Sequence, residues 1–251
     1  MEALFDIRLP KYWVDLTDEQ LTYFYAQLAT QLPFDMILPL CLFHWARLKV
    51  VRFAGDKFVI RKRHSRQEIT VTPQDLQPVV ATLDYLRRFP RMPVCIKRIG
   101  RAWAVPMSFM GVPFGTFIAV DNYYQGFLHT HNYDLLREAA LLLYPKVRRK
   151  SLTTAHLLNI FYWITSLKQS FAQQFPHFFT SAPSSSDNLL GSSDNLYASF
   201  RAATNAQIRA LTGGDITKEQ AVLDMDTWRA LTELDAKADE TERIKKKYNQ
   251  K

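Results

Sequence analysis

Glycine is scarce in this sequence, and its scarcity excludes several ways of binding nucleotides. The 251 residues include only eight glycines, and none falls in the spacing of a phosphate-binding loop or a dinucleotide-binding fingerprint. Patterns that bind structural metals, such as CxxC, HExxH or the EF-hand loop, do not occur either. We therefore expect no nucleotide-driven chemistry, no cofactor and no dedicated metal site.

Cysteines and long apolar runs are also rare. Cys41 and Cys95 lie in the apolar segments LPLCLF and PVCIK, which predicts buried thiols in a reducing compartment rather than a disulfide. No run reaches the roughly 18 to 20 apolar residues that cross a bilayer. The first residues, MEALFDIRLP, contain no apolar signal core. We therefore expect a soluble cytoplasmic protein that does not bind membranes.

What the chain does contain is apolar periodicity at helical spacing along most of its length. Thr17 with Gln20, and Thr217 with Gln220, match capping boxes, while Pro39 either kinks the second helix or marks its true start. Helices are expected over TDEQLTYFYAQLAT, FDMILPLCLFHWARL, TPQDLQPVVATLDYLRRF, two segments of 116–144, LTTAHLLNIFYWITSLKQSFAQQF, LYASFRAATNAQIRALTGG and a last stretch from Asp226. The composition, 47% hydrophobic and 13% aromatic, supplies a sizeable core for them.

Local features of the helices are also predicted. Leu83 and Leu86 are expected to face inward, Gly213 and Gly214 to end the helix that precedes them, and Asp226 to cap the last helix.

Further predictions concern histidines and caps. A lone histidine in the apolar second helix, His44, is expected to be a hydrogen-bonded core residue. Ser151 is expected to cap the helix that follows it. Between the two helices of 116–144, His129 and His131 are expected in a turn, with Asn132 or Asp134 capping the second helix.

Strand patterns interrupt the helices in the first half of the chain. KVVRFAGDKFVIRKR predicts a β-hairpin turning at Gly55 and Asp56, EITVT a third strand, and MPVCIKRIGRAWAVPM a second hairpin near Gly100. The sequence therefore predicts a predominantly helical α+β fold, with short β-hairpins inserted among helices and a helical appendage at the end. The expected domains are a main domain at 1–179 with a basic β insertion at about 48–105, a serine-rich linker at 180–195 and a helical segment at 196–251.

Positive charge is concentrated in the β insertion. Fourteen of the Lys and Arg residues, against four acids, lie between Arg47 and Arg101. In the second strand, cationic residues partly alternate with apolar ones, which predicts one basic face. Its candidate anion-binding residues are Arg61, Lys62, Arg63 and Arg66. Such a patch could contact nucleic acid, an anionic membrane or an acidic protein, or it could be a solvated strand face with long side chains.

Candidate catalytic groups are weak. His129, His131 and Asp134 form the nearest thing to a metal cluster, but two histidines at a helix junction do not share a face as they would on a strand. The cysteines look too buried to act as nucleophiles. We therefore expect a non-enzymatic protein with no catalytic residues.

Two apolar stripes are candidates for contacts with other proteins. Phe161 and Phe171 belong to a stripe along the helix at about 152–175, which could be core, a partner groove or a membrane-surface face, although its polar side has few cations. Trp228, Leu231 and Leu234 form a narrow seam on the last helix. One seam cannot bury a helical pair fully, so this segment should pack on the main domain or on another chain.

Four segments also carry a resemblance. They are YWVDLTDEQLTYFYAQL, DNYYQGFLHTHNYDLLREAALLLYP, FYWITSLKQSFAQQFPHFF and LTGGDITKEQAVLDMDTWRALTELDAKA. Together they resemble uncharacterised proteins of phage and prophage structural gene regions in gut anaerobes. The last segment also resembles the ends of tail-assembly chaperones, which keep the tape-measure protein soluble while the tail tube forms around it. The resemblance implies no catalytic residue.

The leading hypothesis is therefore a non-enzymatic phage morphogenesis factor or virion-associated structural protein. It would contact a phage tail or tape-measure protein, or a copy of itself, in the host cytoplasm or in the virion. The alternative hypothesis is a nucleic-acid-binding protein that uses the basic β-hairpin region.

Overall fold

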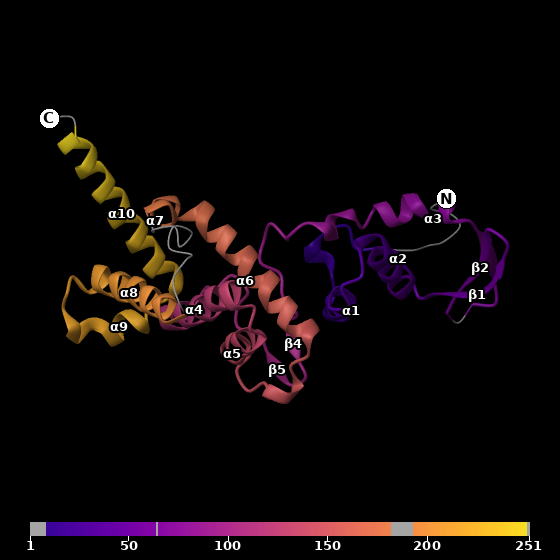
Figure 1. Ribbon diagram of the computed structural model, residues 1–251, viewed down its shortest axis with the longest axis horizontal. Coiled ribbons are helices and arrows are strands. Elements are labelled where there is room, and N and C mark those ends of the chain that lie inside the picture. Colours follow the sequence, from indigo (N-terminus) through magenta and orange to yellow (C-terminus); the bar gives the residue numbers. More distant parts are fainter. Residues whose placement is uncertain (1–8, 64, 182–192, 250–251) are drawn as a thin grey trace. The chain divides into compact units, whose positions relative to one another are not determined.

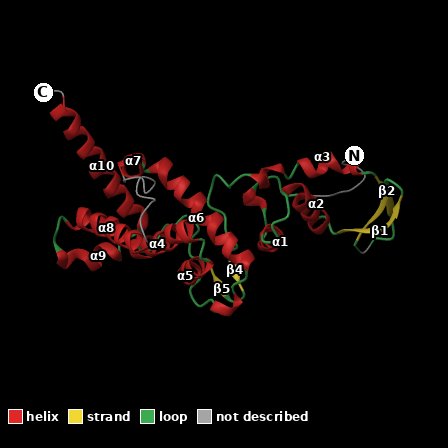
Figure 2. Cartoon of the chain, viewed as in Figure 1, coloured by secondary structure: helices red, strands yellow, loops and turns green. Residues whose placement is uncertain are grey.

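The computed structural model describes residues 9–63, 65–181 and 193–249 and confirms the predominantly helical α+β fold. Helices account for 63% of it, and the strands form two small antiparallel sheets (Figures 1 and 2). The α-helices are α1 (Asp18–Leu28), α2 (Phe34–Trp45), α3 (Pro73–Ala81), α4 (Phe114–Thr130), α5 (Tyr133–Leu143), α6 (Thr154–Gln174), α7 (Pro176–Ser181), α8 (Ser193–Thr212), α9 (Glu219–Leu223) and α10 (Thr227–Asn249). The strands are β1 (Leu48–Ala54), β2 (Lys57–Lys62), β3 (Glu68–Val71), β4 (Arg98–Ile99) and β5 (Ala102–Trp103), and the 3-10 helices are η1 (Trp13–Asp15), η2 (Asp84–Arg87), η3 (Arg149–Ser151) and η4 (Ile216–Lys218).

The chain divides into two compact units. Unit 1 contains the residues up to 90 together with 94–97 and 153–162, and unit 2 contains 91–93, 98–152 and the residues from 163 onward. This division differs from the expected domains, because the last helices share a unit with 98–152 instead of forming an appendage. Most of the expected linker at 180–195 lies outside the described residues.

The helices of unit 1 pack around buried aromatic rings. In the confirmed capping box, Gln20 N donates to Thr17 Oγ1 and Thr17 N donates to Gln20 Oε1. The indole of Trp13 contacts the rings of Phe24 and Tyr85 edge-on. Its Nε1 donates to the backbone carbonyls of Tyr85 and Arg88, both at 3.2 Å. The indole is thus buried with its polar group satisfied, as such rings require.

Two predictions for α2 can be compared with the structure. Pro39 lies inside the helix, which begins at Phe34. The prediction that His44 is a core residue was wrong, because it sits in the last turn and is exposed. Its ring stacks flat on Tyr23 of α1, with centroids 3.7 Å apart.

The helix expected over TPQDLQPVVATLDYLRRF is broken. It starts with a capping box, in which Asp75 N donates to Thr72 Oγ1 and Thr72 N to Asp75 Oδ2. It ends at Ala81, where Thr82 turns back and donates to the carbonyl of Val79. The 3-10 helix η2 follows, and this turn lets Leu83 and Leu86 both reach the core, as expected from the sequence.

In unit 2, the predicted helical pair of 116–144 is confirmed. His131 ends α4 in the left-handed region, with φ of 53°. Asn132 caps α5, since its Oδ1 accepts from Asp134 N. Tyr124, Phe127 and Leu143 are buried, so this stretch belongs to the core.

Helix α6 begins later than predicted. Ser151 does not cap it but lies in η3. The helix begins at Thr154, after Thr153, whose N donates to His156 Nδ1 at 3.1 Å while Thr153 Oγ1 accepts from His156 N at 3.5 Å. Histidine at the third helical position therefore completes the cap, which the usual Glu or Gln pattern does not predict.

The last helices follow the sequence signals in part. Gly213 and Gly214 end α8 with φ of 66° and 86°, as predicted. The predicted capping box of Thr217 with Gln220 was wrong, because Thr217 N donates instead to Asp215 Oδ1, and this starts η4. Asp226 caps α10 as expected, accepting from Arg229 N.

Candidate binding surfaces

The three-stranded sheet of unit 1 has one apolar face and one basic face. Strand order is β1-β2-β3, and both pairs are antiparallel. Directly paired residues share a face, and faces alternate along each strand. The apolar face therefore contains Leu48, Val50, Phe53, Phe58, Ile60, Ile69 and Val71. Ile60 is fully buried on it, and the ring of Phe58 contacts Phe43 of α2, so the middle of this face packs against α2, while Phe53 at the edge is exposed.

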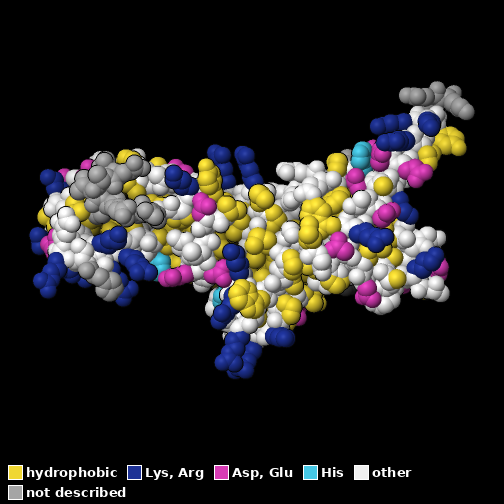
Figure 3. All heavy atoms as spheres, turned by 180° about the vertical axis from the view of Figure 1, so that it is seen from behind, with side chains coloured by type: hydrophobic (Ala, Val, Ile, Leu, Met, Phe, Trp, Pro, Cys, Tyr) yellow, Lys and Arg dark blue, Asp and Glu magenta, His cyan; other side chains and the backbone are white. Residues whose placement is uncertain are grey.

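The opposite face, which we call the basic face, contains Lys49, Arg52, Lys57 and Arg61. The other positions on this face are Ala54, Val59, Glu68 and Thr70. Lys49, Arg52 and Lys57 are exposed, and Arg61 is partly exposed. Lysine and arginine side chains gather at the end of unit 1 that holds the sheet (Figure 3).

A β-bulge at Val51 puts Arg52 on this face. Val50 pairs with Ile60 and Arg52 with Val59, so β1 has one more residue than β2 between these pairs. Such an extra residue shifts the alternation of one strand by one position. Without that shift, Arg52 would point to the apolar face and Phe53 to the basic face.

Acidic residues balance the basic face only partly. Glu68 Oε2 lies 3.2 Å from Arg52 Nη1, and Glu68 Oε1 lies 4.0 Å from Arg61 Nη1. Asp75, at the start of α3, has its pKa lowered mainly by hydrogen bonds from the backbone and side chain of Thr72, and also by the charge of Lys57. Lys49 lies directly opposite Arg61, and the strand register pairs it with no acidic residue. The face therefore keeps a net positive charge.

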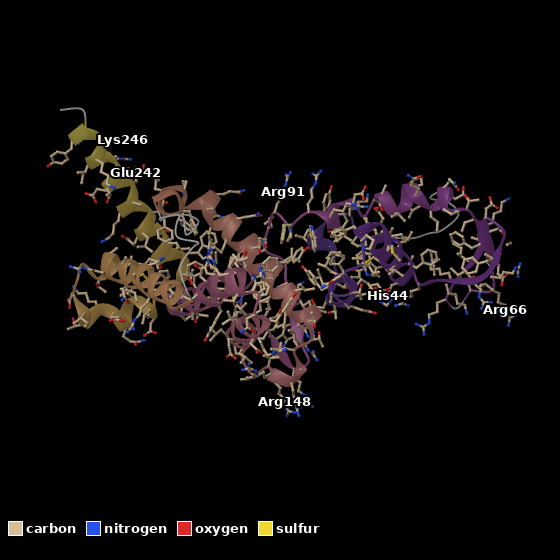
Figure 4. The ribbon with its side chains drawn as sticks, viewed as in Figure 1. His44, Arg66, Arg91, Arg148, Glu242 and Lys246 are labelled. Atoms are coloured by element: carbon tan, nitrogen blue, oxygen red, sulfur yellow. The ribbon has the colours of Figure 1, made fainter. Side chains whose placement is uncertain are left out.

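The four predicted patch residues do not form one surface. Arg61 lies on the basic face, whereas Lys62 pairs with Leu48 and points to the other side of the sheet. Arg63 and Arg66 lie beyond the end of β2, where both are exposed, and Figure 4 labels Arg66. The sequence correctly predicts one basic face on β2, but Lys49 and Arg52 were missed. Only the strand register and the bulge bring them beside Arg61.

The predicted partner-binding residues lie mostly inside the protein. Phe171, Leu231 and Leu234 are buried in unit 2. The ring of Trp228 contacts Phe171 edge-on, and its Nε1 donates to the carbonyl of Ser108 at 2.7 Å. In unit 1, Phe161 is half-buried and contacts Phe89. These side chains serve packing within each unit and leave little surface for another protein.

Beyond this anchored part, the outer part of α10 is exposed. Figure 1 shows α10 extending past α7, and Figure 4 labels Glu242 and Lys246 on it. Ile244 is 48% exposed and Tyr248 is 76% exposed, and at a spacing of four they share one face of the helix. Three acids from Asp239 to Glu242 precede four bases from Arg243 to Lys247. Residues 243–249, which contain the four bases together with Ile244 and Tyr248, are hereafter called the outer segment of α10.

The candidate catalytic groups do not assemble into a site in the described residues. His131 contacts the ring of Phe127, while Asp134 forms ion pairs with Arg137 and Arg149. Within the described residues, no group of three His, Cys, Asp or Glu side chains could hold a metal ion. Cys41 is buried, as predicted, and burial raises the pKa of its thiol to about 12.

Comparison with known proteins adds no relative. No family model, curated protein or solved structure gives a significant match to this chain. No helix among the described residues is both long and apolar enough to cross a membrane.

Proposed function

We propose that this chain is a non-enzymatic protein that works in phage assembly by binding another protein, as a tail-assembly factor or a virion-associated structural protein. The sequence resemblance to phage structural regions supports the setting. The exposed outer segment of α10 supports the mode of action, and it is the observation that carries the proposal. The proposed partner is a helical segment of a phage tail or tape-measure protein.

The construction of α10 favours this use. Its first part is fixed in unit 2 through Trp228, Leu231 and Leu234, so the helix has a rigid base. A little further on, Phe178 N of α7 donates to Asp235 Oδ1 at 2.9 Å. Beyond these contacts, Ile244 and Tyr248 present an apolar pair flanked by charge. An anchored helix with a narrow exposed apolar stripe is suited to pairing with another helix.

The test is co-purification after co-expression with phage tail and tape-measure proteins. Removing residues 196–251 would strip buried residues from unit 2, so smaller changes are needed. The variant Ile244→Asp/Tyr248→Asp should lose the partner, because it places charge on the proposed contact. Ile216→Asp is the matched control, since Ile216 is 81% exposed elsewhere in unit 2, and it should keep the partner.

A chain that ends at Glu242 provides a second test, because it removes the outer segment but keeps the acids that lie near His177. Retention of the partner by this chain and by the double variant would refute the proposal. Sedimentation equilibrium of the protein alone separates a foreign partner from self-assembly. A dimer that the double variant abolishes would identify a second copy as the partner instead.

A further inference from the structure

The basic face of the sheet has a placement of charge that the proposed function does not use. Lys49, Arg52, Lys57 and Arg61 come from two neighbouring strands and share one side of the sheet. Lys49 is directly opposite Arg61, at the roughly 5 Å spacing of paired strands, and Lys57 and Arg61 lie about 13 Å apart along β2. Arg63 and Arg66, which lie past the end of β2, are exposed as well.

We propose that this face binds double-stranded nucleic acid through its phosphate backbone. Nucleic-acid backbones carry closely spaced negative charge, and lysine and arginine on long flexible stems can reach successive phosphates. This proposal goes beyond the protein contact of α10 and does not depend on it.

The face lacks the groups that would favour single strands. Proteins that bind single-stranded nucleic acid stack its bases on exposed aromatic rings. None of the eight positions on the basic face, at 49, 52, 54, 57, 59, 61, 68 and 70, is aromatic. The rings of Phe53 and Phe58 lie on the opposite face. Contacts to phosphates alone therefore favour a duplex, read without regard to sequence.

The face also lacks the groups that would favour a membrane. Surface-bound segments insert large apolar side chains beside their cations. On the basic face, Val59 is buried and Ala54 is the only exposed aliphatic side chain. A surface with net positive charge and few exposed apolar side chains matches a polyanion in water better than a lipid interface.

The ion pairs of Glu68 do not cancel this surface. One carboxylate faces both Arg52 and Arg61, so it cannot neutralise both guanidinium groups. Exposed pairs of this type are weak, typically about 0–1 kcal/mol. Phosphates can therefore share or replace Glu68 as partners of the two arginines.

The experiment measures binding of a fluorescent duplex of about 25 base pairs by anisotropy at several salt concentrations. Each phosphate contact contributes about −0.9 to the slope of log K against log salt, so four contacts predict a slope of about −3.6. The variant Lys49→Gln/Arg52→Gln/Lys57→Gln/Arg61→Gln should weaken binding at least about tenfold near 50 mM salt and flatten the slope.

The matched control, Arg148→Gln/Lys150→Gln/Arg201→Gln/Arg229→Gln, removes the same charge from exposed positions in unit 2 outside the outer segment of α10. It should retain the binding and the slope. Lys49→Gln/Lys57→Gln leaves the ion pairs of Glu68 intact and should lose about half of the slope. This smaller variant tests the proposal even where the fourfold variant does not fold, as judged by circular dichroism and urea unfolding.

Four results would overturn the proposal. The first is no binding of the duplex by the wild-type protein at low salt, and the second is equal weakening by the fourfold variant and its control. The third is displacement of the duplex by poly-glutamate as efficiently, per charge, as by unlabelled duplex, which would identify an acidic protein as the ligand. Tighter binding of a single strand of the same length would replace the duplex with single-stranded nucleic acid. None of these results changes the outcome expected for the α10 variants.

Discussion

The sheet of unit 1 and the aromatic core of unit 2 use similar apolar residues for different ends. In unit 2, Trp163 is fully buried, and its Nε1 donates to the carbonyl of Met107 at 2.8 Å. Its ring contacts Phe109 and Tyr144. In the sheet, Val59 and Ile60 are buried on opposite faces, while Phe53 at its edge is 78% exposed and the cations of the basic face are at least partly exposed. The buried rings of unit 2 therefore contribute to stability, whereas the cations of the sheet form the proposed binding surface.

This contrast predicts that stability and binding can be changed separately. Replacing buried rings should unfold unit 2 without a direct effect on charge. Replacing cations on the sheet should change binding with little effect on folding, because exposed ion pairs contribute little. Four substitutions or reactions, from the largest expected effect to the smallest, would break or sharpen the contrast.

The largest effect is expected for Trp163→Ala. Removing a buried indole leaves a cavity and an unpaired carbonyl at Met107, which should cost about 3–5 kcal/mol of unfolding free energy. Urea denaturation of the protein measures it. Trp103→Ala is the matched control within unit 2, because Trp103 is 64% exposed, and it should cost less than about 1 kcal/mol. Similar losses at both tryptophans would remove the distinction between core and surface.

The second prediction concerns α2, which packs against the sheet. It tests whether the buried thiol of Cys41 in this helix is shielded from solvent. Because burial raises the pKa of Cys41 to about 12, its thiolate fraction at pH 8 should be about 10⁻⁴, and its alkylation should be slowed about a thousandfold relative to an exposed cysteine. Raising the pH toward 12 should speed the reaction. Peptide mapping after iodoacetamide treatment separates Cys41 from Cys95. Rapid native labelling of Cys41 would show that α2 opens readily.

An intermediate effect is expected on the apolar face of the sheet. Ile60→Ala should cost about 2–3 kcal/mol, since Ile60 is fully buried but the small sheet can relax around it. Phe53→Ala on the same face should change stability by less than about 1 kcal/mol, because its ring is already in water. Hydrogen exchange of β2 amides would locate the loss. A larger cost at Phe53 than at Ile60 would mean that the edge of the sheet, not its centre, holds it to the helices.

The smallest effect on folding is expected for Arg52→Gln/Arg61→Gln. Both pairs with Glu68 are at least partly exposed, so the unfolding free energy should change by less than about 1 kcal/mol. Thermal unfolding followed by circular dichroism measures the change. A loss of several kcal/mol would make these arginines structural and would weaken the separation between the two regions.

The sequence was informative wherever a short pattern has one structural solution. The capping box at Thr17, the turn at Gly55 and Asp56, and the glycines after α8 were all predicted correctly, because each depends on neighbours in the chain. The α4–α5 turn was predicted for the same reason. The predictions for His44, Ser151 and Thr217 were wrong. The burial of a histidine, or the choice of a capping residue, depends on neighbours in the fold that the local sequence does not reveal.

Predicting the candidate surfaces required more knowledge of tertiary structure than predicting the caps and turns did. The apolar stripes of α6 and α10 were visible in the sequence, but the sequence does not say whether a stripe faces its own chain or another. Phe171 and Leu231 face inward, so the exposed surface of α10 had to be sought further along the helix. The basic face required the pairing of Lys49 with Arg61, which is set by the register of two strands and not by spacing in one.

Val51 has a consequence for anyone who transfers or redesigns this sheet. The strand β1 carries two phases of alternation, one before the bulge and one after it, and the change of phase sorts Arg52 from Phe53. A graft that copies the cationic residues but straightens the strand around Val51 would turn Arg52 toward the apolar face and Phe53 toward the basic face. The separation of charged from apolar side chains on the sheet therefore depends on a backbone irregularity as much as on the lysines and arginines themselves.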